Sequence, residues 1–82
     1  MEVRVLYFAA LRDLVGKPEE RLELPPGVTT VGSLASYLGE RVPGLRERMA
    51  FVRLARNQEF AQAGDGLNEG DVIALIPPVA GG

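Results

Sequence analysis

Hydrophobic and polar positions alternate near the start of the chain, hydrophobic residues recur at a helical spacing in its middle, and a continuous apolar run lies near its end. Residues 2–9 are rich in β-branched and aromatic side chains, which predicts a strand with every second side chain, from Val3 to Tyr7, on one face. Residues 21–24 alternate as well and predict a second strand, paired with the first as a hairpin. The continuous apolar run at 72–76 predicts a last strand with at least one buried face.

The middle of the chain predicts one amphipathic helix over residues 31–41. Thr30 is a suitable cap for its amino terminus, and Pro43-Gly44 ends it. Its apolar residues follow the spacing of a single helical face, namely Val31, Leu34, Ala35 and Leu38. Shorter elements are expected around it: a helical turn over 9–15 closed by Gly16, a further turn over 45–49, and short strands at 51–56 and 59–62, joined by a turn at 57–58.

The element order ββαβββ predicts an α+β fold, in which a mixed sheet of about five strands is covered on one face by the main helix. The first and last strands would be central and parallel, because the long helix can serve as the crossover between them. This is the β-grasp, or ubiquitin-like, architecture. We expect one domain over residues 1–76 and a flexible C-terminal tail over 77–82.

The same alternation predicts what lies on the face of the sheet away from the helix. If Ile73 and Leu75 face the helix, their neighbours in the last strand face the opposite way. Several apolar residues then gather where polar ones would be usual, which predicts a partner-docking surface beside the tail. The alternative is that arginine side chains partly cover these positions, or that they are scattered surface residues. The positions concerned are Leu6, Phe8, Phe60 and Ile76.

The amino-acid composition excludes several kinds of catalytic and metal-binding site. The 82 residues include no Cys and no His, which excludes thiolate catalysis, disulfides, imidazole acid–base chemistry and the usual zinc sites. A net charge of −2 argues against nucleic-acid binding. No apolar run approaches the about 20 residues of a membrane span, and no signal peptide precedes the first strand, so we expect a cytoplasmic protein. Asp65, Glu69 and Asp71 are predicted to be solvated turn residues, with no metal site.

The sequence closes on an apolar segment that contains no charged side chain. Pro77 and Pro78 fix their own backbone angles and favour an extended chain. Gly81 and Gly82 lack Cβ, so their backbone could enter a passage too narrow for other residues. We therefore predict that the Gly82 carboxylate carries the chemistry and that the rest of the chain presents it. The predicted tail consists of Pro77, Pro78, Val79, Ala80, Gly81 and Gly82.

Two segments resemble the small subunit of molybdopterin synthase, a ubiquitin-like sulfur carrier. They are residues 5–13 (VLYFAALRD) and 69–82 (EGDVIALIPPVAGG). The resemblance implies that a ubiquitin-E1-like activating enzyme uses ATP and Mg²⁺ to adenylate Gly82. It further implies that a persulfide donor system converts the adenylate to a thiocarboxylate. The tail would then enter the large synthase subunit and give its sulfur to cyclic pyranopterin monophosphate in molybdenum cofactor biosynthesis.

The resemblance also implies a non-catalytic, sulfur-donating role, with no cofactor bound by the chain itself and the catalytic residues on the large subunit. It assigns partner contact to Phe8, Phe60 and Ile76, although the family often has Phe where Ile76 stands. Several related functions are also compatible with the sequence. The chain could carry sulfur for thiamine synthesis or tRNA thiolation, act as a ubiquitin-like protein modifier, or be a binding module whose terminal glycines are incidental.

Overall fold

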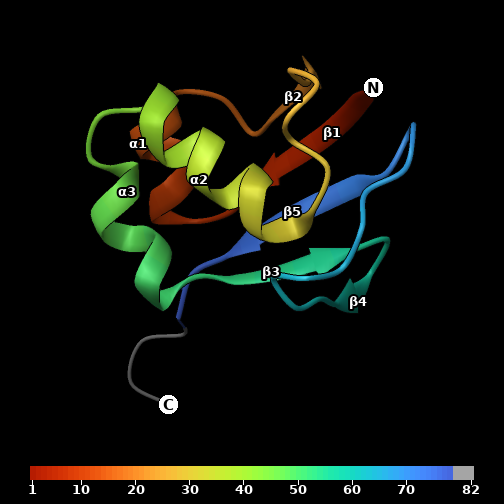
Figure 1. The fold of residues 1–82 in the computed structure, drawn as a ribbon. Coiled ribbons are helices and arrows are strands. Elements are labelled where there is room, and N and C mark those ends of the chain that lie inside the picture. Colours follow the sequence, from red (N-terminus) through yellow and green to blue (C-terminus); the bar gives the residue numbers. More distant parts are fainter. Residues whose placement is uncertain (79–82) are drawn as a thin grey trace.

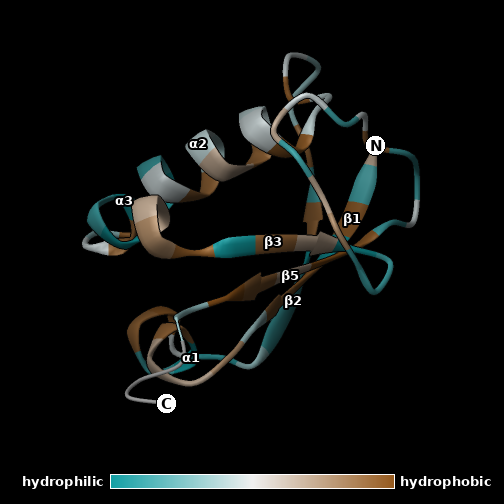
Figure 2. Cartoon of the chain, turned by 90° about the horizontal axis from the view of Figure 1, so that it is seen from below, coloured by the Kyte–Doolittle hydropathy of each residue, from teal (hydrophilic) through white to brown (hydrophobic). Residues whose placement is uncertain are grey.

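The computed structural model describes residues 1–78 as a five-stranded sheet with helices packed against it (Figure 1). Its longest helix is α2, which lies across one face of the sheet (Figures 1 and 2). The elements in chain order are β1 (Glu2–Tyr7), α1 (Ala10–Val15), β2 (Glu19–Glu23), α2 (Val31–Arg41), α3 (Leu45–Arg48), the 3₁₀ turn η1 (Met49–Phe51), β3 (Arg53–Arg56), β4 (Glu59–Phe60) and β5 (Val72–Ile76).

The strands are arranged in the order β2-β1-β5-β3-β4. β1 and β5 are parallel neighbours near the middle of the sheet, whereas every other pairing is antiparallel. A parallel pair needs a crossover connection, and the long segment that contains α2 provides it. The predicted mixed sheet, with its first and last strands side by side, is confirmed.

Helix α2 has the bounds that the sequence predicts, and its amino terminus explains why. The Thr30 hydroxyl accepts a hydrogen bond from the Ser33 amide at 3.1 Å, and the Ser33 hydroxyl accepts one from the Thr30 amide at 2.9 Å. This reciprocal capping satisfies donors that a helix start otherwise leaves unpaired. The helix buries Val31, Leu34 and Leu38 completely or nearly so.

The hydrophobic core lies between α2 and the sheet. β1 contributes Val3, Val5 and Tyr7, each at most 2% exposed, which confirms the predicted alternation. β5 contributes Ile73 and Leu75, which are fully buried. α1 ends as expected at a glycine: Gly16 adopts a left-handed conformation (φ 92°), and its amide donates to the Arg12 carbonyl at 2.8 Å.

The strand predicted from residue 51 begins two residues later, because its neighbour β5 offers no further partner. Arg53 lies opposite Ile76, which is the last residue of β5. The next residues, Pro77 and Pro78, have no amide hydrogen to donate to a ladder. Phe51 therefore belongs to η1, and its side chain is 70% exposed. Within residues 1–78, no helix has both the length and the apolar character that a membrane crossing requires.

The prediction that Asp71 is a solvated turn residue is wrong, since its side chain is only 7% exposed. One carboxylate oxygen accepts a hydrogen bond from the Asn57 side-chain amide at 3.0 Å, and the other accepts from the Asn68 backbone amide at 2.8 Å. The Asn57 side-chain oxygen in turn accepts from the Val72 amide at 2.9 Å. These bonds tie the β3–β4 turn to the start of β5.

The other two acidic turn residues are more open. Glu69 is exposed and accepts a hydrogen bond from the Glu2 amide at 3.1 Å, while Asp65 is half-buried and accepts from the Gln62 amide at 2.9 Å. The predicted turn at 57–58 is confirmed, with Asn57 and Gln58 at φ 51° and 73°. Two consecutive residues with positive φ are what a tight hairpin between β3 and β4 requires.

Candidate functional site

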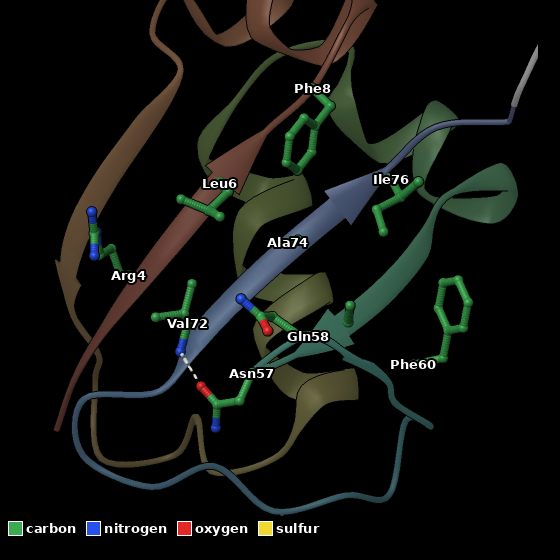
Figure 3. Close-up of a pocket in the computed structure, with 10 residues that line it drawn as sticks. Arg4, Leu6, Phe8, Asn57, Gln58, Phe60, Val72, Ala74 and Ile76 are labelled. Atoms are coloured by element: carbon green, nitrogen blue, oxygen red, sulfur yellow. Dashed lines mark hydrogen bonds between the residues drawn. The ribbon is translucent and has the colours of Figure 1, made fainter.

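The face of the sheet opposite the core carries a shallow cavity of about 740 Å³ (Figure 3). Its floor is formed by alternate residues of the central strands, including Val72, Ala74 and Ala55. Arg4, Asn57 and Gln58 give the cavity a polar end. The apolar residues predicted for partner contact line it as well, namely Leu6, Phe8, Phe60 and Ile76; we call these four residues the docking face.

The structure places the docking face where the alternation predicted it. Phe8 is 46% exposed and Phe60 is 61% exposed, while Leu6 and Ile76 are half-buried. Leu6 lies opposite Ala74 in the parallel β1–β5 pair, so the residues at the ends of these two strands fall close together. Exposed aromatic side chains grouped around an apolar cavity are typical of a protein-binding surface. That these four residues bind a partner stays a prediction.

The alternative that arginine side chains partly cover these residues holds at Phe60. The guanidinium carbon of Arg53 lies 3.6 Å from the centre of the Phe60 ring, in cation–π geometry. Arg53 is itself exposed, and it lies opposite Ile76 in the β3–β5 pair.

A second hollow, of about 240 Å³, lies at the base of the predicted tail. Pro77 and Pro78 form one side of it, and Phe51 is among the residues that line the remainder. Phe51 is the functional candidate that the sequence prediction missed, because residue 51 was assigned to a strand. The signal that could have found it is the Pro77-Pro78 pair, which ends strand pairing. The remaining tail residues Val79, Ala80, Gly81 and Gly82 lie outside the described residues.

Behind the docking face, Tyr7 and Glu20 form a partly buried hydrogen bond. The Tyr7 hydroxyl donates to a Glu20 carboxylate oxygen at 2.7 Å, and Glu20 also lies 3.5 Å from Arg41 and 3.8 Å from Lys17. Burial, and then the hydrogen bond to Glu20, raise the pKa of Tyr7 well above its ordinary value. The phenol is therefore protonated at neutral pH, and it joins β1 to β2 beneath the surface.

The chemistry available at the cavity favours binding. Its walls offer alkyl and aromatic groups, two side-chain amides and one guanidinium. Within the described range 1–78, acidic side chains do not gather in groups of three that could hold a metal ion. The geometry therefore describes a platform that can hold a partner beside the point where Pro77 leaves the sheet.

A model of the ThiS family matches residues 5–82 of the sequence. The chain belongs to the ThiS family. It is 41% identical over 83 residues to the molybdopterin synthase sulfur carrier subunit of Mycobacterium tuberculosis, covering 100% of this chain and 99% of the relative. The family resemblance stated from residues 5–13 and 69–82 is thereby confirmed.

Solved structures agree with the fold of this ThiS-family chain. SAMP1 from Haloferax volcanii superimposes with a TM-score of 0.86 and 30% identity over the whole of both chains. A protein–protein complex of subunits 1 and 2 of the molybdopterin-converting factor from Helicobacter pylori contains a chain with a TM-score of 0.72 and 25% identity, again over the whole of both chains. The predicted β-grasp architecture is confirmed.

Proposed function

We propose that this ThiS-family chain is the sulfur carrier subunit of a molybdopterin synthase. The observation that carries the proposal is the 41% identity to such a subunit, over an alignment that covers 100% of this chain. The Helicobacter pylori structure supports it, because there a chain of this fold is complexed with a second subunit of the molybdopterin-converting factor.

In this proposal the reactive group is the carboxylate of Gly82. A carboxylate is a poor acyl donor until one of its oxygens becomes part of a good leaving group. An E1-like enzyme would supply that group by transferring AMP from ATP, with Mg²⁺, to Gly82. A persulfide donor system would then convert the acyl-adenylate to a thiocarboxylate. ATP and Mg²⁺ belong to the activating enzyme, and the carrier itself holds no cofactor.

The thiocarboxylated tail would next enter the large synthase subunit and transfer its sulfur to cyclic pyranopterin monophosphate. Two such transfers build the dithiolene of molybdopterin. The large subunit supplies the catalytic residues, which agrees with a carrier that lacks Cys and His. Activation needs ATP, so we place the protein in the cytoplasm.

The docking face lies where it could hold a partner close to the tail. Ile76 ends β5, and Pro77 follows it directly, so a protein seated on Leu6, Phe8, Phe60 and Ile76 lies beside the root of the tail. Residues 79–82 could reach about 13 Å beyond Pro78 if fully extended. A partner held on this face could therefore receive Gly82 in a pocket a short distance away.

The test is reconstituted sulfur transfer. The thiocarboxylated chain is mixed with the large synthase subunit and cyclic pyranopterin monophosphate, and molybdopterin is measured. We expect product with the full chain and none with a variant that lacks Gly81 and Gly82. Product formed equally well by the truncated variant would contradict the proposal. Co-purification with a thiazole synthase or a tRNA thiolase in place of the large subunit would assign the chain to thiamine synthesis or tRNA thiolation.

A protein-modifier function is the second candidate, and a specific similarity favours it. The small archaeal modifier protein 1 of Haloferax volcanii has a TM-score of 0.82 and 29% identity, covering 95% of this chain and 98% of that one. A modifier would form isopeptide-linked adducts with target lysines. Such adducts in cell extract would support this function, whereas a discrete complex with the large subunit would favour sulfur transfer.

A further inference from the structure

We propose that Arg53 is a cationic anchor at the border of the docking face, and that the protein receiving the tail presents a carboxylate to it. This inference rests on the proposed function, because it concerns the partner of the same surface. It adds a charged, directional contact to a surface otherwise described by its apolar residues.

The position of Arg53 is set by strand pairing. It is the first residue of β3 and lies opposite Ile76, the residue that precedes the tail. On its other side its guanidinium lies over the ring of Phe60, 3.6 Å from the ring centre. Arg53 therefore stands between two members of the docking face, at the end of the sheet from which the tail leaves.

The charge of Arg53 has no carboxylate partner within the described residues 1–78. Arg4 of β1 pairs with Glu19 at 3.2 Å, and Arg41 of α2 pairs with Glu20 at 3.5 Å, whereas Arg21 of β2 resembles Arg53 in having no carboxylate partner within residues 1–78. Arg56 donates a hydrogen bond to the Gly66 carbonyl. Arg53 instead stacks on Phe60, and stacking uses the flat face of the guanidinium. Its N–H groups, which lie in the guanidinium plane, stay available to an acceptor.

The chemistry of the partner follows from these contacts. A planar guanidinium with free donors matches a carboxylate, which can accept two parallel hydrogen bonds. The surrounding apolar residues would exclude water when the partner docks, and an ion pair is stronger where water is reduced. Stacking on Phe60 also holds the guanidinium in place, which lowers the cost of ordering it on binding. We infer that an Asp or Glu of the large subunit lies opposite Arg53.

The experiment is calorimetric titration of the full chain with the large synthase subunit of the same organism, in low and moderate salt. Arg53→Gln should weaken binding about tenfold and make the affinity less dependent on salt. Arg53→Lys should restore part of the loss, and Arg53→Glu should weaken binding further than Arg53→Gln. Arg21→Gln is the matched control, because Arg21 is exposed on β2 at the opposite edge of the sheet. We expect it to bind as the wild type does.

Wild-type affinity and salt dependence in Arg53→Gln would overturn the anchor while leaving the proposed function in place. Equal losses in the Gln and Glu variants, with no recovery in Lys, would also overturn it, because they would show a packing role without charge. A wild-type chain that fails to bind the large subunit would overturn the proposed function and the anchor with it. A wild-type homodimer that Arg53→Gln dissociates would assign the residue to self-association and overturn the inference.

Discussion

Tyr7 of β1 lies directly opposite Leu75 of β5 in the parallel pair at the middle of the sheet. Both side chains are buried in the core, so the residue that follows each of them points to the other face: Phe8, just beyond the end of β1, and Ile76, the last residue of β5. Figure 3 shows these two residues at the same end of the cavity. The register of the β1–β5 pair therefore determines which side chains of these strands enter the core, and it places the docking face beside the tail.

The docking face predicts unequal effects for two exposed phenylalanines. Phe60→Ala should weaken binding to the large subunit by about 2 kcal/mol, because truncating an aromatic side chain that an interface buries often costs that much. It should change the free energy of unfolding by less than about 0.5 kcal/mol, since Phe60 is 61% exposed.

Phe51→Ala is the matched variant for this test. Phe51 is similarly exposed but lines the hollow at the base of the tail. Phe51→Ala should lose less affinity for the large subunit than Phe60→Ala does. Titration calorimetry measures the affinity of both variants, and urea unfolding measures their stability. A larger loss from Phe51→Ala would move the main contact from the docking face to the tail root.

The buried carboxylate of Asp71 predicts a stability effect far from the tail. Asp71→Ala removes two hydrogen bonds and leaves the Asn57 amide and the Asn68 backbone amide without their acceptor. We expect a loss of about 1–3 kcal/mol in the free energy of unfolding. Asp65→Ala, which removes a single hydrogen bond at a half-buried turn, should cost clearly less in the same urea titration. Equal losses would argue against a special role for the buried acid.

Tyr7 predicts a pH dependence at the alkaline end. Its pKa is raised in the folded chain, so folding favours the protonated phenol. This contribution is complete below the ordinary tyrosine pKa of about 10 and is lost as the pH rises above it. The urea midpoint of the wild type should therefore fall above about pH 10. Tyr7→Phe should show a shallower fall in that range and, at neutral pH, a loss of about 1 kcal/mol from the missing bond to Glu20.

Tyr37→Phe provides the control for the alkaline titration, because it retains Tyr7 and its bond to Glu20. This variant should keep the wild-type fall in stability above pH 10. If the urea midpoint of Tyr7→Phe fell with pH as steeply as that of the wild type and of Tyr37→Phe, the prediction would be contradicted. Folding would then not favour the protonated Tyr7 phenol over the ionised one.

Much of the fold could be predicted because local and global signals agree. Thr30 and the spacing of Val31, Leu34 and Leu38 specify α2, and the structure confirms its bounds. The two-residue period of side chains along the strands predicted at 2–9 and 72–76 separates the core face from the open face, and this was enough to group Leu6, Phe8 and Ile76. These elements form because their apolar side chains must be buried, and the spacing of apolar residues can be read from the sequence alone.

The misplaced residues depend on contacts between distant segments. The burial of Asp71 requires Asn57, 14 residues away, to supply a hydrogen-bond donor. The start of β3 depends on where β5 ends, because Arg53 pairs with Ile76 and no later residue of β5 is left for Phe51. The stacking of Arg53 on Phe60 likewise needs the β3–β4 hairpin to form first. Such relationships follow from strand register, which the pattern of one strand does not specify.

The central claim is that Gly82 carries sulfur, and the intact mass of the chain tests it most directly. The full chain is incubated with ATP, Mg²⁺, the E1-like activating enzyme and a sulfur donor, beside a Gly81→Ile variant of the same fold. Replacement of one carboxylate oxygen by sulfur should raise the mass of the wild type by about 16 Da and leave the variant unchanged. An unchanged wild-type mass, or the same gain in Gly81→Ile, would contradict the account.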